Sequence, residues 1–456
     1  MSSVFRLFNL VEEADRISQL QASLVADSME RVSRLHPHYR KVIRQLDLRP
    51  DDFDDVSSLD GFPITSKSDF VRDPEQFRLE PDPADPDDYV LWDVAYTSGT
   101  STGRPTPMYQ TAYDFRALML AQRRMAEIRG MDSSDRIVNL YPITALPHGA
   151  WLRCNQAAAA IGASLTAGMS GRHVDGIPVV RDTEEIVQLT AAADPTVLWG
   201  VPSYVRRVLQ VLVDRGHQVP SLRIVAVSGE PCGDGMRQSI NELAAQAGAG
   251  PGFVVSDSLG ATELQCGLVE CVPGAGFHNP APEFFHLAAV DADGATVGDG
   301  EEGRLILTHL DRRGTVLVRF NLGDSVVFTN DPCPNCGRGG GRVIAHLGRS
   351  GSHTKIRGNL VDLGQVSSAI GTIAHVVEHQ LVIKRPERDE LGLDEFTVRL
   401  VVADGADGGG VASDVARAVA IAARMDVAVE IVERDVIWSN GPDMKPPRVL
   451  DIRTDD

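Results

Sequence analysis

The sequence predicts an α/β protein with a large N-terminal domain of layered sheets and helices that includes a β module, and a small, mobile α+β domain at the C-terminus. Three observations lead to this prediction. From Asp93 onward, short apolar runs alternate with amphipathic helical patterns, which is typical of layered proteins with mostly parallel sheets. After Gly294 the helical patterns stop, and the apolar runs favour an antiparallel module. From residue 352 on, strands and helices mix again.

The N-terminal domain is expected to span residues 1–349. Its first part, residues 1–80, has a helical and polar pattern and ends at the Pro- and Asp-rich stretch Pro81–Asp88. Periodicity then predicts strands at Arg136–Tyr141, Thr196–Val201, Leu222–Ser228 and Gly252–Ser256, and helices at Tyr113–Arg129, Glu184–Ala192 and Pro202–Arg215. The β module is expected at residues 294–345, with strands at Arg304–Leu310 and Thr315–Phe328.

The C-terminal domain is expected to span residues 352–456, after a short polar boundary at Arg349–Ser352. Its pattern predicts helices at Val361–Ala374 and Val411–Arg424, strands at Val376–Lys384, Glu395–Val402 and Val427–Val432, and a flexible loop at Gly405–Gly410.

Composition and charge exclude several classes of function. The 456 residues carry 44 Lys and Arg against 63 Asp and Glu, a formal charge of −19. Such an excess of negative charge repels nucleic acid and anionic membranes, so neither is expected as a partner. The six cysteines are too few for a disulfide scaffold in a chain of this length. We therefore expect a cytoplasmic enzyme.

The first candidate site is the segment Tyr96-Thr-Ser-Gly-Thr-Ser-Thr-Gly-Arg-Pro105, which precedes a predicted helix. Its glycines let backbone N–H groups converge on an anion, and its hydroxyls add donors for phosphate oxygens. By itself the segment is also compatible with a surface turn. The candidate phosphate-binding residues are Thr97, Ser98, Gly99, Thr100, Ser101, Thr102 and Gly103.

Two further segments follow predicted parallel strands, at the sheet edge where open α/β sheets bind ligands. They consist of Ser228, Gly229, Glu230 and Pro231, and of Ser258, Leu259, Gly260, Ala261, Thr262 and Glu263. The carboxylate of Glu263 is a hard oxygen ligand suited to Mg²⁺ that bridges phosphates. The competing interpretation of Glu263 is a solvated acid at a helix N-terminus.

The last candidate nucleotide-binding segment, Arg319-Phe-Asn-Leu-Gly-Asp324, ends a β run. The carboxylate of Asp324, beside a glycine turn, can accept hydrogen bonds from two ribose hydroxyls. By itself Asp324 is also compatible with an ordinary turn residue.

In this order the motifs resemble those of the adenylate-forming superfamily of acyl-CoA synthetases, adenylation domains and luciferases. Gly348-Arg349 and Lys355-Ile-Arg-Gly358 are similar to its hinge motif, and Met444-Lys-Pro-Pro-Arg448 to its C-terminal lysine motif. The N-terminal segments His36–Arg40 and Leu59–Pro63, with Lys67, resemble the phenylacetate–CoA ligase branch. The sequence departs from the family in its longer phosphate loop, at Leu259 in place of an aromatic residue, at Gly351 in place of the hinge Asp, and at Met444 in place of Gly.

The resemblance implies a two-step ligase reaction. A carboxylate attacks the α-phosphorus of ATP and releases pyrophosphate, and a thiol then displaces AMP from the acyl-adenylate. The implied roles are Mg²⁺ binding for Glu263 and Thr262, ribose binding for Asp324 and Arg349, and charge neutralisation by Lys445. The competing interpretation of Lys445 is an exposed lysine near the C-terminus.

The apolar and aromatic character of two segments, together with the resemblance, favours an aryl or arylacetic acid as substrate. The expected pocket residues are Tyr141, His148, Gly149, Trp151, Gly200 and Tyr204, although a core or surface position explains His148 equally well. The expected acceptor is CoA. Alternatives are a carrier-protein thiol or an amine, and more remotely a non-catalytic homologue that acts as a binding module. A homodimer is one option for the assembly.

The pair Cys333-Pro-Asn-Cys336-Gly has the spacing of a zinc knuckle, in which two thiolates from one turn bind one Zn²⁺. A redox Cys-x-x-Cys is the alternative, but it requires a strand–helix context that this Gly-rich stretch lacks. The other expected ligands are Cys271 and His278, a pattern similar to that in members of the phenylacetate ligase branch. Cys266 and His286 are the second choice for these two ligands. Zinc would be structural.

Overall fold

The computed structural model describes residues 9–11, 13, 16–97, 105–143, 149–171, 179–349, 353–357, 359–385, 394–403, 405–438 and 448–453. The chain forms two compact units. Unit 1 comprises residues 1–134, 144–164 and 258–346, and unit 2 comprises residues 135–143, 165–257 and 347–456. The predicted domain boundary at residues 349–352 stays a prediction. No described helix is both long enough and apolar enough to cross a membrane.

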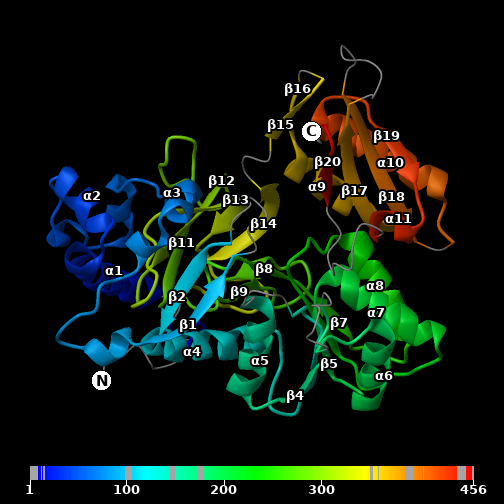
Figure 1. The fold of residues 1–456 in the computed structure, drawn as a ribbon, viewed down its shortest axis with the longest axis horizontal. Coiled ribbons are helices and arrows are strands. Elements are labelled where there is room, and N and C mark those ends of the chain that lie inside the picture. The colour runs from blue at the N-terminus through cyan, green and yellow to red at the C-terminus, as the bar shows by residue number, and fades with distance from the viewer. Residues whose placement is uncertain are drawn as a thin grey trace. The chain divides into compact units, whose positions relative to one another are not determined.

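Unit 1 is built on an antiparallel sheet of seven strands in the order β11-β12-β13-β14-β10-β9-β8 (Figure 1). These strands are β8 (Ser258–Gly260), β9 (Gly267–Val269), β10 (Phe277–His278), β11 (Phe285–Val290), β12 (Glu302–His309), β13 (Phe320–Thr329) and β14 (Arg342–Arg349). A separate hairpin pairs β1 (Leu91–Tyr96) with β2 (Pro107–Thr111). The antiparallel module predicted after Gly294 is confirmed.

The helices of unit 1 are α1 (Ile17–Leu35), α2 (Tyr39–Gln45), α3 (Lys67–Arg72), α4 (Ala112–Ile128) and α5 (Gly149–Ile161). The helix α1 buries one face, including Leu24, Val32 and Leu35, in the same core as the strand residues Leu307 and Phe320. The helix α4 begins at a capping box, because Thr111 and Asp114 each accept a backbone N–H of the other. These contacts fix the N-terminal segment to the sheet.

Unit 2 contains the parallel sheet that the alternation predicts, in the order β4-β3-β5-β6-β7. Its strands are β3 (Arg136–Asn139), β4 (Ser164–Ala167), β5 (Val197–Gly200), β6 (Ile224–Val227) and β7 (Val254–Ser256), and its helices are α6 (Thr183–Ala193), α7 (Pro202–Asp214) and α8 (Asp234–Gln246). Every residue of β5 and β6 is buried, as expected for strands covered on both faces.

Unit 2 also contains a four-stranded sheet in the order β19-β18-β17-β20. Its elements, with the neighbouring hairpin β15–β16, are β15 (His353–Ile356), β16 (Asn359–Asp362), α9 (Leu363–Gly371), β17 (Val376–Lys384), β18 (Glu395–Val402), α10 (Gly408–Ala423), β19 (Ala428–Ile431), α11 (Arg434–Trp438) and β20 (Val449–Asp451). The predicted strands at Val376–Lys384 and Glu395–Val402 are confirmed to the residue. The α/β class is likewise confirmed.

Three predicted boundaries are wrong. Val361 lies in β16, because Asp362 caps α9 by accepting backbone N–H bonds from Gly364 and Gln365. Residues 408–410 form the first turn of α10 and are not a loop. The predicted strand Thr315–Phe328 is interrupted at Arg319, whose φ of +44° breaks extended geometry, so β13 begins one residue later.

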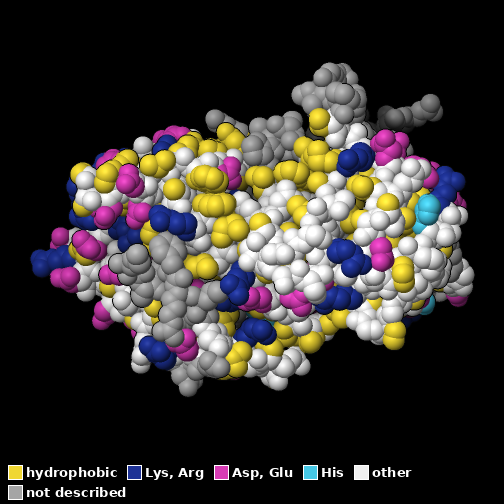
Figure 2. All heavy atoms as spheres, turned by 90° about the horizontal axis from the view of Figure 1, so that it is seen from below, with side chains coloured by type: hydrophobic (Ala, Val, Ile, Leu, Met, Phe, Trp, Pro, Cys, Tyr) yellow, Lys and Arg dark blue, Asp and Glu magenta, His cyan; other side chains and the backbone are white. Residues whose placement is uncertain are grey.

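The surface of the molecule carries charges of both signs. Figure 2 shows basic and acidic side chains interspersed with hydrophobic ones over the face that it displays. The net negative charge is therefore not gathered into one continuous acidic patch on that face.

Candidate functional site

The turn after β6 contains one of the predicted nucleotide-binding segments, residues 228–231. Ser228 directly follows β6, and its Oγ is hydrogen-bonded to the hydroxyl of Tyr141. The backbone N–H of Tyr141 donates to Oδ1 of Asn139, the last residue of β3 (3.0 Å). Because β3 and β6 flank β5 in the sheet, Tyr141 and Ser228 connect two strand ends. This is the sheet edge at which ligands bind in parallel α/β sheets.

Glu230, in the same turn, is buried and its carboxylate bonds within the protein. Its Oε2 accepts the backbone N–H of Ser203 at the start of α7 (3.4 Å) and lies 3.5 Å from Nη2 of Arg448. Arg448 is also paired with the buried Glu378. Oε2 of Glu230 is thus held by Ser203 and Arg448, and contacts of residues 228–231 to a nucleotide stay a prediction.

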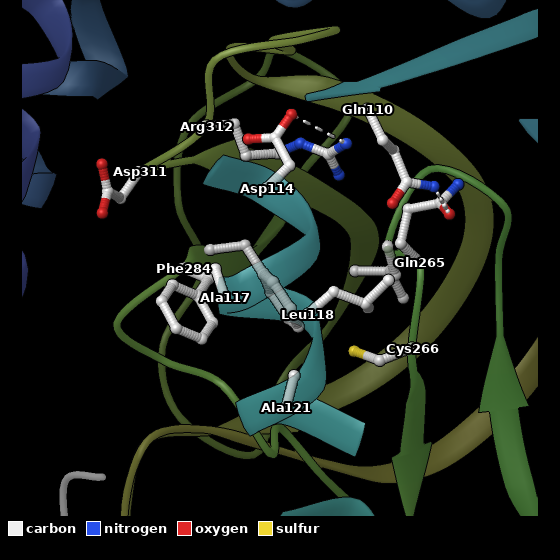
Figure 3. A pocket seen from close by; sticks show the side chains of 12 residues that line it. Gln110, Asp114, Ala117, Leu118, Ala121, Gln265, Cys266, Phe284, Asp311 and Arg312 are labelled. Carbon is white, nitrogen blue, oxygen red and sulfur yellow. Dashed lines mark hydrogen bonds and ion pairs between the residues drawn. The ribbon is translucent and has the colours of Figure 1, made fainter. Parts of the chain in front are cut away.

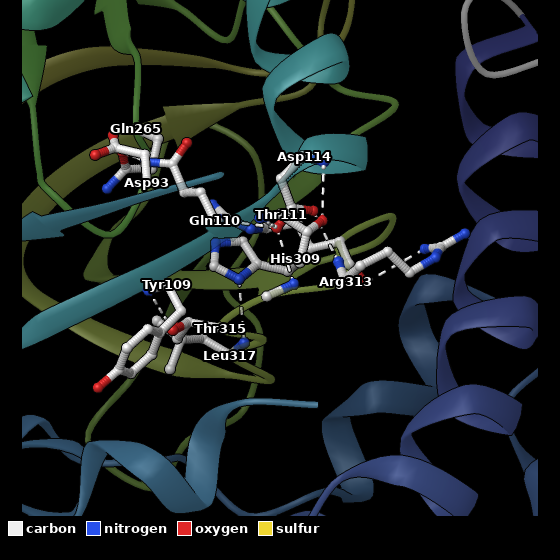
Figure 4. Close-up of polar contacts among 12 residues, drawn as sticks. Asp93, Tyr109, Gln110, Thr111, Asp114, Gln265, His309, Arg313, Thr315 and Leu317 are labelled. Carbon is white, nitrogen blue, oxygen red and sulfur yellow. Dashed lines mark hydrogen bonds and ion pairs between the residues drawn. The ribbon is translucent and has the colours of Figure 1, made fainter. Parts of the chain in front are cut away.

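Glu263 lies in a turn after β8 and is 4 % exposed, so the alternative of a solvated helix-terminal acid is wrong. Its Oε1 lies 3.7 Å from Nζ of Lys67, and its backbone carbonyl accepts a hydrogen bond from Nε2 of His309 (3.0 Å). The other ring nitrogen of His309 accepts the backbone N–H of Leu317, as Figure 4 shows. Burial and the charge of Arg312 hold the pKa of His309 well below its ordinary value.

Asp324 lies inside β13, not at the end of a strand as predicted. Between the pairs Arg304–Ser325 and Ile306–Asn321, β13 contains two more residues than β12, so it bulges there. Gly323 has a φ of +84°, and its N–H donates to Oδ1 of Asn321 (2.9 Å). The carboxylate of Asp324 accepts a hydrogen bond from Nε2 of His346 (3.0 Å).

Of the predicted phosphate-binding residues 97–103, the structure describes only Thr97. Thr97 is buried, and it exchanges hydrogen bonds with Thr106: its N–H donates to the carbonyl and its Oγ1 accepts the N–H, both at 3.0 Å. Several predicted site residues lie outside the described residues, namely Ser98, Gly99, Thr100, Ser101, Thr102, Gly103, His148 and Lys445. The side chain of Arg349 is also outside the described part of the chain. Their roles stay predictions.

The described residues of the expected acyl pocket belong to both units. Gly149 and Trp151 lie on α5 of unit 1, and Tyr141, Gly200 and Tyr204 lie in unit 2. A Cβ atom at Gly200 would lie 2.9 Å from Cβ of Leu140, which explains a glycine at the end of β5. Burial raises the pKa of Tyr204, and its hydroxyl is bonded to Thr183. The pocket assignment stays a prediction.

A small cavity in unit 1 lies between α4 and the segment Leu264–Cys266 (Figure 3). Its polar end is formed by Gln110, Gln265 and Arg312, and Ala117, Leu118, Ala121 and Phe284 form its apolar end. Its volume of about 30 Å³ is enough for about two water molecules. An aryl ring does not fit there, so this cavity is not the pocket for an aromatic acid.

Cys271, His278, Cys333 and Cys336 are brought together in unit 1, and their ligand atoms all lie within 4.8 Å of one another. The Sγ atoms of Cys271 and Cys333 are 4.0 Å apart, and Sγ of Cys336 lies 3.7 Å from Nε2 of His278. Thiolates bound tetrahedrally to zinc at about 2.3 Å are separated by about 3.8 Å. The donor set and its spacing therefore fit one Zn²⁺.

The surroundings of this cluster distinguish it from the alternatives. His278 is 1 % exposed, and burial and two nearby arginines lower its pKa to about 4, which keeps the imidazole neutral as a ligand must be. Cys333 and Cys336 lie in a turn between two strands, not in the strand–helix context of a redox motif. Among the described residues, Cys266 and His286 are not part of the cluster.

Sequence analysis missed three residues that contact the candidate site. Lys67 was part of a motif but had no role, and its partner Glu263 is distant in the chain. His346 and Arg448 are bonded to Asp324 and Glu230 respectively. No local pattern identifies such partners, because each contact depends on the tertiary fold.

Comparisons with known proteins agree with the fold and the motifs. A family model described as AMP-binding enzyme matches residues 17–309. The phenylacetate-coenzyme A ligase of Aromatoleum evansii is 25% identical over 350 residues, which are 75% of this chain and 73% of that protein. The phenylacetate-coenzyme A ligase of Escherichia coli strain K12 is 26% identical over 378 residues, which are 81% of this chain and 80% of that protein.

A solved structure of 2-hydroxyisobutyryl-CoA ligase, in the postadenylation state with R3-HIB-AMP, has a TM-score of 0.77 to this protein. The alignment covers 96% of this chain and 90% of that one at 21% identity, so it shows a shared fold. The family match over residues 17–309, which is more than half of the chain, establishes that the chain belongs to the family of AMP-binding enzymes.

Proposed function

We propose that this protein activates a carboxylic acid with ATP and transfers the acyl group to the thiol of CoA. In the first step, a carboxylate oxygen attacks the α-phosphorus and pyrophosphate leaves, which gives an acyl-adenylate. In the second step, the thiol sulfur attacks the acyl carbon, its proton is lost, and AMP leaves. The family match and relatives named as CoA ligases support this reaction.

The observation that carries the proposal is the buried carboxylate of Glu263, which lies 3.7 Å from the partly exposed ammonium group of Lys67. A carboxylate kept from solvent beside an ammonium group is costly to bury, which favours a binding role over a surface role. Glu263, with Thr262, would hold Mg²⁺, which neutralises charge on the phosphates. Lys67 is close enough to compensate the carboxylate when no cation is present. Asp324 and Arg349 would bind the ribose.

The remaining roles follow the chemistry of each group. The loop containing Thr97, Gly99 and Gly103 would bind phosphate oxygens through backbone N–H groups and hydroxyls. Lys445 would neutralise the charge that builds up between the acid and the α-phosphate. Residues of the turn 228–231 and the segment 258–261 would contact the adenine. Because the carboxylate of Glu230 is ion-paired with Arg448, we propose that it maintains the conformation of this turn.

We propose an aryl or arylacetic acid as the substrate. The curated relatives are phenylacetate–CoA ligases, although at 25% and 26% identity. Tyr141, which follows β3, and Trp199, near the end of β5, are buried aromatic residues at the edge of the sheet where Ser228 lies, and they would form the wall of an aromatic pocket. Tyr141 is also bonded to Ser228 of the nucleotide-contacting turn, and so connects the two parts of the proposed site.

We also propose that Cys271, His278, Cys333 and Cys336 hold one structural Zn²⁺. The fit of the four donor atoms supports this proposal. The ion would tie the segment between β9 and β10 to the turn between β13 and β14.

The test is pyrophosphate exchange into ATP with a panel of aliphatic, aryl and arylacetic acids, followed by analysis of products with CoA. Exchange that depends on an aromatic acid, and formation of its CoA thioester, is the expected result. Exchange without a CoA thioester, but with transfer to a phosphopantetheinylated carrier protein or an amine, would identify the alternative acceptor. No exchange with any acid would contradict the proposed activity.

A further inference from the structure

We infer that His346 is a positioning residue that fixes the carboxylate of Asp324 for the ribose of ATP, and so contributes to selection of ribonucleotides. The inference rests on the proposed nucleotide-binding function. It adds a residue to which no sequence motif assigns a role.

The backbone that precedes Asp324 in β13 is held by contacts from distant parts of unit 1. The N–H of Thr65 donates to the carbonyl of Arg319 (2.9 Å), and the N–H of Asn321 donates to the carbonyl of Thr65 (3.0 Å). The guanidinium group of Arg319 donates to the carbonyls of Asp60 (2.5 Å) and Phe62 (2.7 Å). The start of β13 is therefore fixed to the N-terminal segment, which limits the movement of the bulge.

The bulge then directs the side chain of Asp324. Extended backbone places successive side chains on opposite faces, and the extra residues of a bulge change which face a side chain occupies. The left-handed φ of Gly323 and its N–H bond to Asn321 stabilise this local conformation. The Asp324 side chain is 5 % exposed, so its carboxylate is presented from a fixed backbone with little solvent around it.

A carboxylate can rotate about its terminal bond unless partners of its oxygen atoms restrict it. His346, on the neighbouring strand β14, restricts this rotation because its Nε2 donates to Oδ1 at 3.0 Å. Nε2 carries a proton in the imidazolium ion and in one neutral tautomer, so it can donate in both charge states. A carboxylate held in one orientation is prepared to accept hydrogen bonds from two adjacent hydroxyls, since less freedom is lost on binding.

The exposures of the two side chains agree with this role. Asp324 is 5 % exposed while His346 is 27 % exposed, so the imidazole reaches from the strand surface to a nearly enclosed acid. If the pair only stabilised the sheet, losing it would weaken the binding of every nucleotide by the same factor. If His346 acts through Asp324 on the ribose, losing it weakens only the nucleotides that carry the hydroxyls. The two roles therefore differ in a measurable way.

The experiment measures dissociation constants of the full-length protein for Mg–ATP and Mg–2′,3′-dideoxyATP by calorimetry. His346→Leu is expected to weaken ATP binding about five- to tenfold, and to change dideoxyATP binding less than about twofold. His346→Gln, whose amide can donate in place of Nε2, is expected to restore ATP affinity to within about twofold of the parent. His217→Leu, which replaces a partly buried histidine of unit 2, is the matched control and should change neither value.

Asp324→Asn separates failure of this inference from failure of the proposed function. If Asp324→Asn weakens ATP but not dideoxyATP, while His346→Leu weakens both equally or neither, the ribose site stands and the role of His346 is refuted. If the parent protein does not bind ATP, or Asp324→Asn does not distinguish the two nucleotides, the proposed ribose site is refuted together with the inference.

Discussion

At the scale of single residues, the candidate site depends on buried charged groups whose partners come from distant parts of the chain. Glu263 is paired with Lys67, Asp324 with His346, and Glu230 with Arg448. In each pair the carboxylate is the enclosed member, so removing its basic partner leaves the carboxylate in surroundings with little water. A substitution therefore changes both the chemistry of the site and the electrostatics around it.

The first prediction concerns Glu263. Glu263→Gln keeps the shape of the side chain but removes the charge, and is expected to lower kcat/KM for Mg–ATP in pyrophosphate exchange by about 10²–10³-fold. Glu80→Gln, which neutralises a half-exposed carboxylate paired with Arg40, is the control and should leave exchange unchanged. Parental exchange rates in Glu263→Gln would remove this residue from the reaction.

The second prediction concerns Lys445. Lys445→Ala is expected to lower acid-dependent pyrophosphate exchange by about 10²–10³-fold, since charge neutralisation at the α-phosphate is lost. Transfer of the acyl group from a chemically prepared acyl-adenylate to CoA should continue at nearly the parental rate. Lys384→Ala removes an exposed lysine paired with Glu395 and serves as the control. An equal loss of both half-reactions would show that Lys445 acts structurally.

At the scale of elements, the cluster of Cys271, His278, Cys333 and Cys336 and the bulge of β13 show what sequence patterns can predict and where they fail. Cys333 and Cys336 were identified from their spacing, and the structure places Cys271 and His278 beside them. The role of Asp324 stays a prediction, but its predicted setting at the end of a strand was wrong. A Gly-Asp pair is typical of a turn, and the extra residues of a bulge appear only when the partner strand is known.

The third prediction is one Zn²⁺ per chain in protein purified without added metal, measured by mass spectrometry. Cys336→Ser is expected to lose most of the zinc and to lower the thermal unfolding midpoint by about 5 °C, because metal binding stabilises the folded state. Cys266→Ser replaces a buried cysteine outside the cluster and should keep the zinc. Full zinc content in Cys336→Ser would show that the ligand set is wrong.

At the scale of the whole molecule, the class and nine of the 20 described strands followed from hydrophobic patterns, among them β5 and β6, whose residues are all buried. The strands β17 and β18 were predicted to the residue. The division into units was not predictable, since residues 135–143 and 165–257 group with 347–456 through contacts distant in the sequence. The short strands β8, β9 and β10 were missed, because two or three residues are too few to show alternation.

The fourth prediction is a loss of stability in mild acid. His36 is fully enclosed: its Nε2 donates to the carbonyl of Val316, its Nδ1 accepts the N–H of Tyr39, and burial lowers its pKa to about 3. The unfolded chain binds a proton near pH 6.5 that the folded chain does not bind until about pH 3. The free energy of unfolding therefore decreases as the pH falls below about 6.5.

Urea unfolding at pH 7 and pH 5 measures this effect. For His36 alone the expected difference is about 2 kcal/mol. His36→Asn, whose side-chain oxygen can accept the N–H of Tyr39 but cannot titrate, should reduce the difference by that amount, whatever its absolute stability. An unchanged difference between the two pH values would show that His36 does not cause the acid sensitivity.

The pairing of Glu230 with Arg448 has a consequence for how shortened forms of this protein can be used. A chain cut after Trp438 keeps every residue of the nucleotide-contacting turn but lacks the cation that is ion-paired with Glu230 and Glu378. Both carboxylates are buried, so the cut removes an ion-pair partner from each of them. Ligand screening against such a truncated protein would therefore select compounds for an altered turn at residues 228–231, and inhibitors should be sought with the full-length chain.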